Sequence, residues 1–517
     1  MHRISPPPVV HEPTIFVFWL HSCPAVDMAH SIHYGILLFS AAVLAALLAA
    51  GEADSIGFSL HHRSSPVVRR WADARGHAPD TWWPEAAAEG TSEYYSALSR
   101  NDRALFARRG LASGNDQGQG QLAFGNATFQ LEGYLHYAEV AVGTPKATFL
   151  VALDTGSDLF WVPCDCQHCG NATAQGGHAY SPSRSSTSKT VTCKHALCLC
   201  DRPEACALRN SSCPYTVRYV PANASSSGVL VEDVLYLSRE NQHGAGAREA
   251  VQAPIVFGCG REQTAGAFLG GLMGLGMGKV SVPSLLASGG NVASNSFSMC
   301  FSDDGAGRIS FGDAVSPGQA QTPFILTDTP PTCKIHTRGM NVENLDVPLE
   351  FDAVVDSGAS FTYLTKDPYT AFAYELISKI QDQRANLSAS VPFEYCYVLS
   401  PNQTEIYIPD VSFWTKGGGK FPVTRPFFVV MADDRHGNGA VVGYCLAILK
   451  SETGVNVFGQ NFMTGLKVVF DRERFVLGWS KFDCYRDVEM EEVGSAPPAP
   501  APATAPGPAA TAYGRTI

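Results

Sequence analysis

The chain has 517 residues, which is long for one ordinary domain and suits two or three. Hydrophobic residues make up 45% and charged residues 16%, a balance that excludes wholesale disorder. The net charge of −11, without a dense run of Lys and Arg, argues against nucleic acid as a partner.

An apolar run near the start predicts export. Residues 35–50 are almost continuously apolar, about the length of a signal-peptide core, and the small residues Gly51 and Ala53 follow. We take Met28 as the start and residues 28–53 as a signal peptide. The alternative is a signal anchor that stays in the membrane, which the shortness of the run disfavours. We therefore expect the secretory pathway, ending in the extracellular space, cell wall or vacuole, with membrane association left open.

Residues 54–121 are rich in arginine, and their eight arginines balance their eight Asp and Glu residues, which contrasts with the acidic chain. Residues 92–109 are helix-friendly, and Gly110 follows them. An arginine-rich, partly helical stretch between a leader and an acidic body predicts a pro-segment whose arginines hold it near acidic groups at neutral pH and which acid releases. The alternative is a flexible N-terminal arm. The arginines of the stretch are Arg63, Arg69, Arg70, Arg75, Arg100, Arg103, Arg108 and Arg109.

Short β-strands dominate the body that follows. Runs of β-forming residues at 134–142, 148–153 and 229–237 predict strands, and residues 466–470 with 475–479 predict a hairpin. One helix is predicted after residue 366, with Asp367 as its N-cap and Pro368 at its first position. The Pro- and Ala-rich residues 488–517 predict a disordered tail. The fold is expected to be all-β with a few short helices.

The cysteines and glycosylation sequons also indicate an exported protein. Fourteen cysteines lie between Cys164 and Cys484, and eight of them fall within residues 164–213, which predicts disulfides. Zinc is the alternative, but the Cys and His spacings there fit no standard finger, so we expect no metal. Six Asn-x-Ser/Thr sequons lie at Asn126, Asn171, Asn210, Asn223, Asn386 and Asn402.

An internal repeat carries the chemistry. An apolar strand runs into Asp154-Thr155-Gly156, and another runs into Asp356-Ser357-Gly358. Each is followed much later by two apolar residues and a glycine, at Gly274 and at Gly459. One Asp-Thr-Gly is usually a strand-ending turn, whereas the doubled pattern in the same order is far more specific.

Two such loops related by a pseudo-two-fold would bring Asp154 and Asp356 together. The Thr155 and Ser357 hydroxyls can hydrogen-bond backbone across the two-fold, and Gly156 and Gly358 admit the tight turns. Two adjacent carboxylates hold one proton between them, because both cannot ionise readily. The charged member can then activate water while the protonated member polarises a carbonyl, which hydrolyses an amide without metal, cofactor or covalent intermediate.

At these residues the chain resembles the pepsin-like aspartic proteases, of the plant nepenthesin-like type and nearest to the group of aspartyl protease family protein 1. The resemblance rests on residues 154–163, on Phe257-Gly-Cys-Gly and on residues 355–364, and it extends over residues 134–484. It implies a bilobal fold with an N-terminal lobe at 122–323, including a Cys-rich insert at 164–213, and a C-terminal lobe at 324–487. It also implies that the pro-segment blocks the cleft.

The resemblance implies roles for further residues. Ser157 matches the serine that bonds the first catalytic Asp, and Tyr219 matches the flap tyrosine, with Trp161 as the partner of its hydroxyl. Cys396 and Cys445 match the disulfide of the C-terminal lobe. Two departures stand out: Val220 follows Tyr219 where glycine is usual, and Ala359 occupies a position that often carries a hydroxyl.

These observations predict a secreted, monomeric aspartic endopeptidase that is made as a zymogen and acts on polypeptides. The alternative is a catalytically weak binding or inhibitor glycoprotein of the cell wall built on the same fold. Such proteins typically lose an Asp or disrupt a loop, and both loops are intact here. A wall glycoprotein with a glycosylated Ala-Pro tail is compatible with either.

Overall fold

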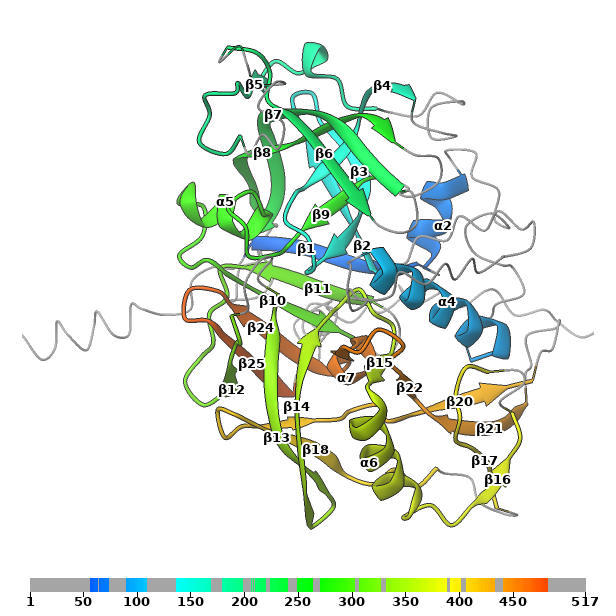
Figure 1. Ribbon diagram of the computed structural model, residues 1–517. Helices are drawn as coiled ribbons and strands as arrows, with labels where there is room; N and C mark the ends of the chain where they lie inside the picture. The colour runs from blue at the N-terminus through cyan, green and yellow to red at the C-terminus, as the bar shows by residue number, and fades with distance from the viewer. Residues whose placement is uncertain are drawn as a thin grey trace, which may run out of the picture. The chain divides into compact units, whose positions relative to one another are not determined.

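The computed structural model describes residues 56–63, 65–73, 90–108, 136–168, 179–198, 206, 208, 210–219, 224–239, 249–263, 270–302, 306–326, 332–387, 391–400, 406–432 and 440–481. The expected signal peptide (28–53) and tail (488–517) lie outside them. The described residues all belong to one unit, in which strands predominate (Figure 1). The all-β, bilobal expectation is confirmed.

The largest sheet joins strands from the beginning, middle and end of the chain. It has 14 strands, and β1 from the expected pro-segment lies inside it, between β11 and β2. In spatial order the strands are β12 (Ala320–Pro323), β25 (Val476–Lys481), β24 (Leu466–Asp471), β10 (Ser296–Phe301), β11 (Ala306–Phe311), β1 (Ile56–His62), β2 (His136–Val142), β3 (Ala147–Asp154), β9 (Leu272–Gly274), β4 (Trp161–His168), β8 (Glu249–Gln263), β7 (Ala224–Arg239) and β5 (Lys189–Thr190), with β6 (Pro214–Tyr219) paired to β7.

Two smaller sheets form from the C-terminal half of the chain. One has seven strands, in the order β19 (Lys420–Pro422), β18 (Val411–Thr415), β13 (Lys334–Val342), β14 (Leu345–Val355), β23 (Asn456–Phe458), β15 (Thr362–Leu364) and β22 (Ile448–Lys450). The other has four, in the order β16 (Gln383–Ala385), β17 (Cys396–Val398), β21 (Val441–Leu446) and β20 (Phe427–Met431).

Helices are a minority in the part of the chain that the structure describes. They are α2 (Pro66–Asp73), α4 (Ser92–Arg108), α5 (Val282–Ser288), α6 (Lys366–Ile377), α7 (Gln460–Met463) and the 3₁₀ turn η2 (Pro182–Arg184). The predicted helix is α6, but its N-cap is Thr365 and not Asp367. The Thr365 backbone N–H and hydroxyl both donate to Asn456 Oδ1, at 2.7 and 3.0 Å, which holds Thr365 extended and lets the helix begin at Lys366.

Burial of apolar strands positions the loops that carry the Asp residues. The last six residues of β3 are all buried, and β3 runs parallel to the buried strand β9. In the other half, the end of β14 is buried and runs parallel to β23. Strand segments covered on both faces read as continuous apolar runs, as residues 149–153 of β3 and residues 353–355 at the end of β14 do in the sequence.

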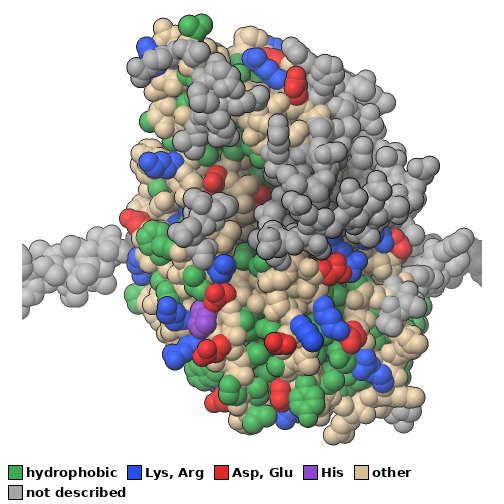
Figure 2. Space-filling model, viewed as in Figure 1, with side chains coloured by type: hydrophobic (Ala, Val, Ile, Leu, Met, Phe, Trp, Pro, Cys, Tyr) green, Lys and Arg blue, Asp and Glu red, His purple; other side chains and the backbone are tan. Residues whose placement is uncertain are grey.

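No helix in the described part of the chain is both long and apolar enough to cross a membrane. On the face shown in Figure 2, Lys and Arg side chains lie among Asp and Glu side chains and form no field of one sign.

Candidate active site

Asp154 ends β3 and is held by its own loop. Its side chain is 2% exposed. The Gly156 N–H donates to Oδ1 at 2.9 Å, and the Ser157 hydroxyl donates to Oδ2 at 2.7 Å. The Asp154 carbonyl accepts the Leu275 N–H at 2.8 Å, which ties the loop to the end of β9. Both carboxylate oxygens therefore have fixed donors.

Asp356 follows β14 and sits in a loop of the same design. It is fully buried, and the Gly358 N–H donates to Oδ1 at 2.9 Å. The Asp356 N–H donates to the Phe458 carbonyl at 3.0 Å, which ties this loop to the end of β23. The backbone thus holds the two carboxyl groups alike, as the sequence repeat predicted.

Two glycines let each loop pack against the backbone that follows it. A Cβ on Gly274 would lie 2.2 Å from the carbonyl carbon of Asp158, and one on Gly459 would lie 2.1 Å from the carbonyl oxygen of Phe361. The register is also repeated, because Trp161 pairs with Leu272 as Tyr363 pairs with Val457. These glycines are therefore required by close backbone approach.

The side chains around the two loops differ. Ala359 is fully buried at the position where the first loop has a hydrogen-bonding Ser157. The Ser357 hydroxyl is buried without a hydrogen-bond partner in the described structure, so the expected bond from Ser357 across the two-fold is not formed. The β-branched Thr155 side chain is restricted to few χ1 rotamers. Serine is less restricted, so Ser357 is not sterically held in the rotamer that would point its hydroxyl at the other loop. Thr155 itself is buried.

The expected flap is a hairpin whose tip, residues 220–223, lies outside the described residues. Tyr219 ends β6 and pairs with Ala224 of β7, and its side chain is likewise outside the described part. Trp161 is fully buried in β4. The described tyrosine near Trp161 is Tyr215: its ring and Trp161 both lie within 2.8 Å of the position that a Cβ on Gly258 would take.

Four disulfides are described, and three of them involve the Cys-rich insert. They are Cys164–Cys259, Cys193–Cys206, Cys198–Cys213 and, in the C-terminal half, Cys396–Cys445. Cys193, Cys198 and Cys206 lie close enough to share a metal, but their sulfurs are in disulfides and are no thiolate ligands. The prediction of disulfides is confirmed by these four, whereas Cys333 is buried and free.

Two of the six sequons lie in the described residues. Asn210 and Asn386 are both exposed, as glycan attachment requires. The other four, Asn126, Asn171, Asn223 and Asn402, lie outside the described residues.

The stretch expected to be a pro-segment contacts the second loop directly, through a residue that the sequence did not single out. Asp102 of α4 is fully buried and accepts hydrogen bonds from the backbone N–H groups of Ser360 and Phe361. A sequence pattern could have indicated Asp102, because positions 94, 95, 98 and 102 lie on one face of a helix and the first three carry apolar residues. An acidic residue on such a face indicates a buried partner.

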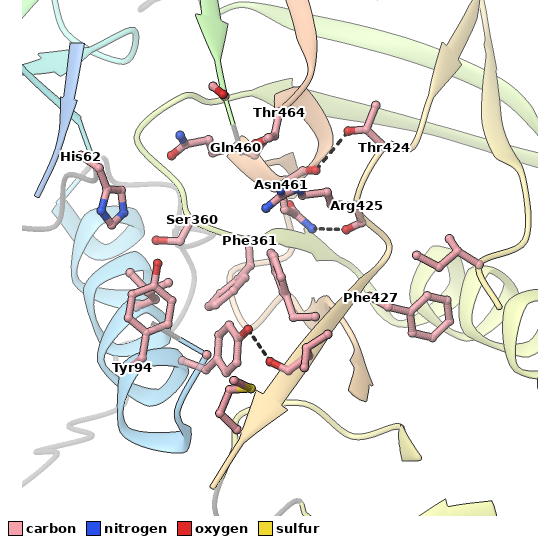
Figure 3. A pocket seen from close by; sticks show the side chains of 18 of the residues that line it. His62, Tyr94, Ser360, Phe361, Thr424, Arg425, Phe427, Gln460, Asn461 and Thr464 are labelled. Carbon is pink, nitrogen blue, oxygen red and sulfur yellow. Dashed lines mark hydrogen bonds between the residues drawn. The ribbon is translucent and has the colours of Figure 1, made fainter. Parts of the chain in front are cut away.

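A cavity of about 660 Å³ lies where α4, β1 and the C-terminal half meet. Figure 3 shows Tyr94 of α4 and His62 of β1 on one side of it, with Phe361, Gln460 and Arg425 on the others. The expected pro-segment therefore forms walls of a cavity beside the second loop.

Comparisons with known proteins give the family. The families described as "Xylanase inhibitor N-terminal" and "Xylanase inhibitor C-terminal" match residues 136–313 and 335–481. Aspartyl protease family protein 1 of Arabidopsis thaliana is 44% identical over 90% of this chain and 87% of its own length. Aspartic proteinase nepenthesin-1 of Nepenthes gracilis is 27% identical over 67% of this chain and 77% of its own.

Solved structures share the fold. Conglutin gamma from lupine seeds has a TM-score of 0.51 at 18% identity, covering 67% of this chain and 92% of its own. The protein edgp has a TM-score of 0.52 at 19% identity, covering 67% of this chain and 91% of its own. Identities this low establish the fold alone.

Together, the two β lobes and the matching Asp loops are those of a pepsin-like protein. The chain belongs to the pepsin-like aspartic protease family, in the branch whose halves match the xylanase-inhibitor descriptions. It is more similar to Aspartyl protease family protein 1 than to the nepenthesin.

Proposed function

We propose that the chain is a secreted aspartic endopeptidase, made as a zymogen, that hydrolyses peptide bonds through Asp154 and Asp356. The observation that carries the proposal is that both Asp residues are present, buried and held by the same backbone N–H geometry, with donor distances of 2.9 Å in each loop. Membership of a family of proteases supports it.

In the proposed mechanism the two carboxyl groups share one proton. The ionised member removes a proton from a bound water, which attacks the peptide carbonyl carbon. The protonated member hydrogen-bonds to the carbonyl oxygen and stabilises the developing negative charge. The tetrahedral intermediate then loses its amine, which takes up a proton from the dyad. Gly156, Gly358 and Ser157 hold the carboxyl groups, so little reorganisation is needed during the reaction.

The zymogen part of the proposal rests on where residues 54–121 lie. Their described portion contributes a strand inside the largest sheet and a helix that contacts the second Asp loop. Residues so placed hinder substrate from reaching that loop. The four described disulfides support an oxidising compartment, and therefore the secretory pathway.

A protease-fold binding protein is the competing function. The descriptions of the matching families name xylanase inhibitors, and Ala359 and Ser357 depart from the support given to the first Asp. Intact Asp residues in both loops favour the enzyme.

A peptide-library assay separates the two functions. Purified protein, first treated with acid, is incubated with the library with and without pepstatin and with and without EDTA, and products are sequenced by mass spectrometry. We expect internal cleavage that pepstatin blocks and EDTA leaves unchanged. Absence of cleavage under every condition, also by protein from which residues 54–121 have been removed, would favour the binding protein, and loss of cleavage in EDTA would require a metal mechanism.

A further inference from the structure

The Asp102 carboxylate is bound by a set of donors on the second Asp loop. Ser360 N–H donates to Oδ1 at 2.8 Å, Phe361 N–H donates to Oδ2 at 3.0 Å, and the Tyr363 hydroxyl donates to Oδ2 at 3.0 Å. Two successive backbone N–H groups form a concave site that suits an anion. Ser360 is four residues from Asp356, so this anion site belongs to the loop of a proposed catalytic residue.

Asp102 lies where solvent cannot compensate for lost partners. Its exposed fraction is 0%, and the preceding residues of the same helical face, Tyr94, Tyr95 and Leu98, are buried as well. A buried carboxyl group without donors is strongly unfavourable. The three donors therefore stabilise α4 in this position. If the helix shifted, the buried carboxyl group would lose its donors, which is unfavourable.

The N-terminal half of α4 is held differently. The Tyr95 ring lies 5.4 Å from the rings of Phe393 and Phe428 and 6.4 Å from that of Phe361, and its hydroxyl donates to the Val429 carbonyl at 2.7 Å. These contacts are mainly apolar and would tolerate small shifts of the helix. The Asp102 contacts are directional, so they fix its position relative to the loop.

Arginines of α4 form two exposed ion pairs, which are weak by comparison. Arg100 pairs with Glu93 of the same helix at 3.1 Å, and Arg103 pairs with Glu452 at 3.4 Å, with all four side chains more than 40% exposed. Exposed pairs contribute little. We expected the arginines to hold the segment in place, whereas the buried polar contact of this helix is formed by an acidic residue, Asp102.

We propose that Ser360, Phe361 and Tyr363 form a site for a carboxyl group on the second catalytic loop, and that Asp102 fills it to anchor the pro-segment. The anchor follows from the geometry alone. Its consequence, that the uncleaved chain is latent, rests on the proposed function.

The titration of Asp102 supports this arrangement. Burial raises its pKa to about 7 from an ordinary 3.8, against the opposing effect of the Ser360 and Phe361 N–H groups. Tyr363 and Arg103 are the other titratable groups near the site. Because the pKa is higher when α4 is bound than when it is free, binding takes up a proton. This contribution to anchoring is thus fully present below about 3.8 and is lost as the pH rises from there through about 7.

Hydrogen exchange of the full-length chain tests the anchor without requiring activity. The variants are Asp102→Asn, which presents an amide N–H₂ to one of two N–H donors, and Tyr363→Phe, which removes one hydroxyl and keeps the ring. Glu93→Gln on the exposed side of the same helix is the control. Exchange is followed by mass spectrometry for residues 92–108, with residues 334–342 as an internal reference.

We expect about tenfold faster exchange of residues 92–108 in Asp102→Asn, a smaller increase in Tyr363→Phe, and none in Glu93→Gln. Wild-type exchange in both Asp102→Asn and Tyr363→Phe would overturn the anchor; if Asp102→Asn fails to fold, Tyr363→Phe alone decides. Peptidase activity of the uncleaved chains is measured in parallel and should rise in Asp102→Asn. Loosened exchange with no activity in any form would retain the anchor and refute the proposed enzyme.

Discussion

At the scale of single residues, the two Asp loops share a backbone but not their side-chain support. Gly156 and Gly358 donate to their Asp residues at the same distance of 2.9 Å, whereas Ser157 has only Ala359 as its counterpart. The strictest limit on residue type applies to Gly274 and Gly459, because a Cβ at either position would overlap backbone atoms of another segment. Backbone cannot move aside as a flexible side chain can, so these positions tolerate no Cβ.

This contact predicts that Gly459→Ala will lower the free energy of unfolding by about 3 kcal/mol, because the methyl group overlaps the Phe361 carbonyl. Urea denaturation measures the change. The matched control is Gly465→Ala: Gly465 has φ of 78° and nothing within 4 Å of the added Cβ, so it isolates the cost of backbone conformation, about 1–2 kcal/mol. A larger loss in Gly465→Ala than in Gly459→Ala would show that close packing is not the constraint.

At the scale of elements, β1 and α4 belong to the same stretch but respond to acid in opposite directions. His62 at the end of β1 pairs with His136 of β2, and their buried rings lie 5.4 Å apart. Burial lowers the pKa of His62 well below 6.5, and neighbouring His136 and Arg63 lower it further. Gln460 contacts His136 Nδ1 at 2.9 Å. The charged form of the His62 imidazole is therefore unfavourable while β1 is bound.

Binding of β1 is expected to weaken in acid. The pKa of His62 is lower in the bound strand than in a released one, so binding of the strand releases a proton from His62. Its contribution is fully present above about 6.5 and is lost as the pH falls, whereas that of Asp102 is lost as the pH rises. Acid should thus loosen β1 while α4 stays anchored.

Exchange of residues 56–62 in the full-length chain measures this effect. After correction for intrinsic rates, opening should increase as the pH falls below about 6.5, by up to about tenfold per unit. His62→Gln should reduce this dependence and leave the part that comes from neighbouring His61, whose pKa is also lowered by burial, whereas His336→Gln, in β13, should leave it unchanged. An acid response as steep in His62→Gln as in the wild type would exclude His62 as its source.

At the scale of the whole molecule, the proposed pro-segment is part of the fold and no appendage. β1 forms six register pairs with β11 and three with β2. The contact between Asp102 and Ser360 joins residues 258 positions apart. Strand, helix and catalytic loop are therefore coupled, and loss of the segment would expose two strand edges as well as the apolar surface beneath α4.

The sequence predicts the parts of this molecule that depend on local or repeated patterns. Apolar runs and turns locate β2, β3, β7 and the β24–β25 hairpin, and the doubled Asp-x-Gly pattern locates both loops. It does not reveal contacts formed between distant segments. The position of α4, the free Cys333 and the unpaired hydroxyl of Ser357 depend on which surfaces meet, and no local pattern encodes that.

Hydrolysis of peptide bonds by Asp154 and Asp356 together is tested most directly by cleavage of a peptide found in the library assay. Acid-treated wild type is compared with Asp154→Asn, Asp356→Asn and a control variant, Asp352→Asn. Asp352 is an exposed residue of β14, the strand that leads into the second loop. Thermal unfolding checks that each variant is folded. We expect either loop variant to lose at least about a hundredfold in kcat/KM while Asp352→Asn retains it. Wild-type cleavage by either Asp154→Asn or Asp356→Asn would contradict catalysis by this pair.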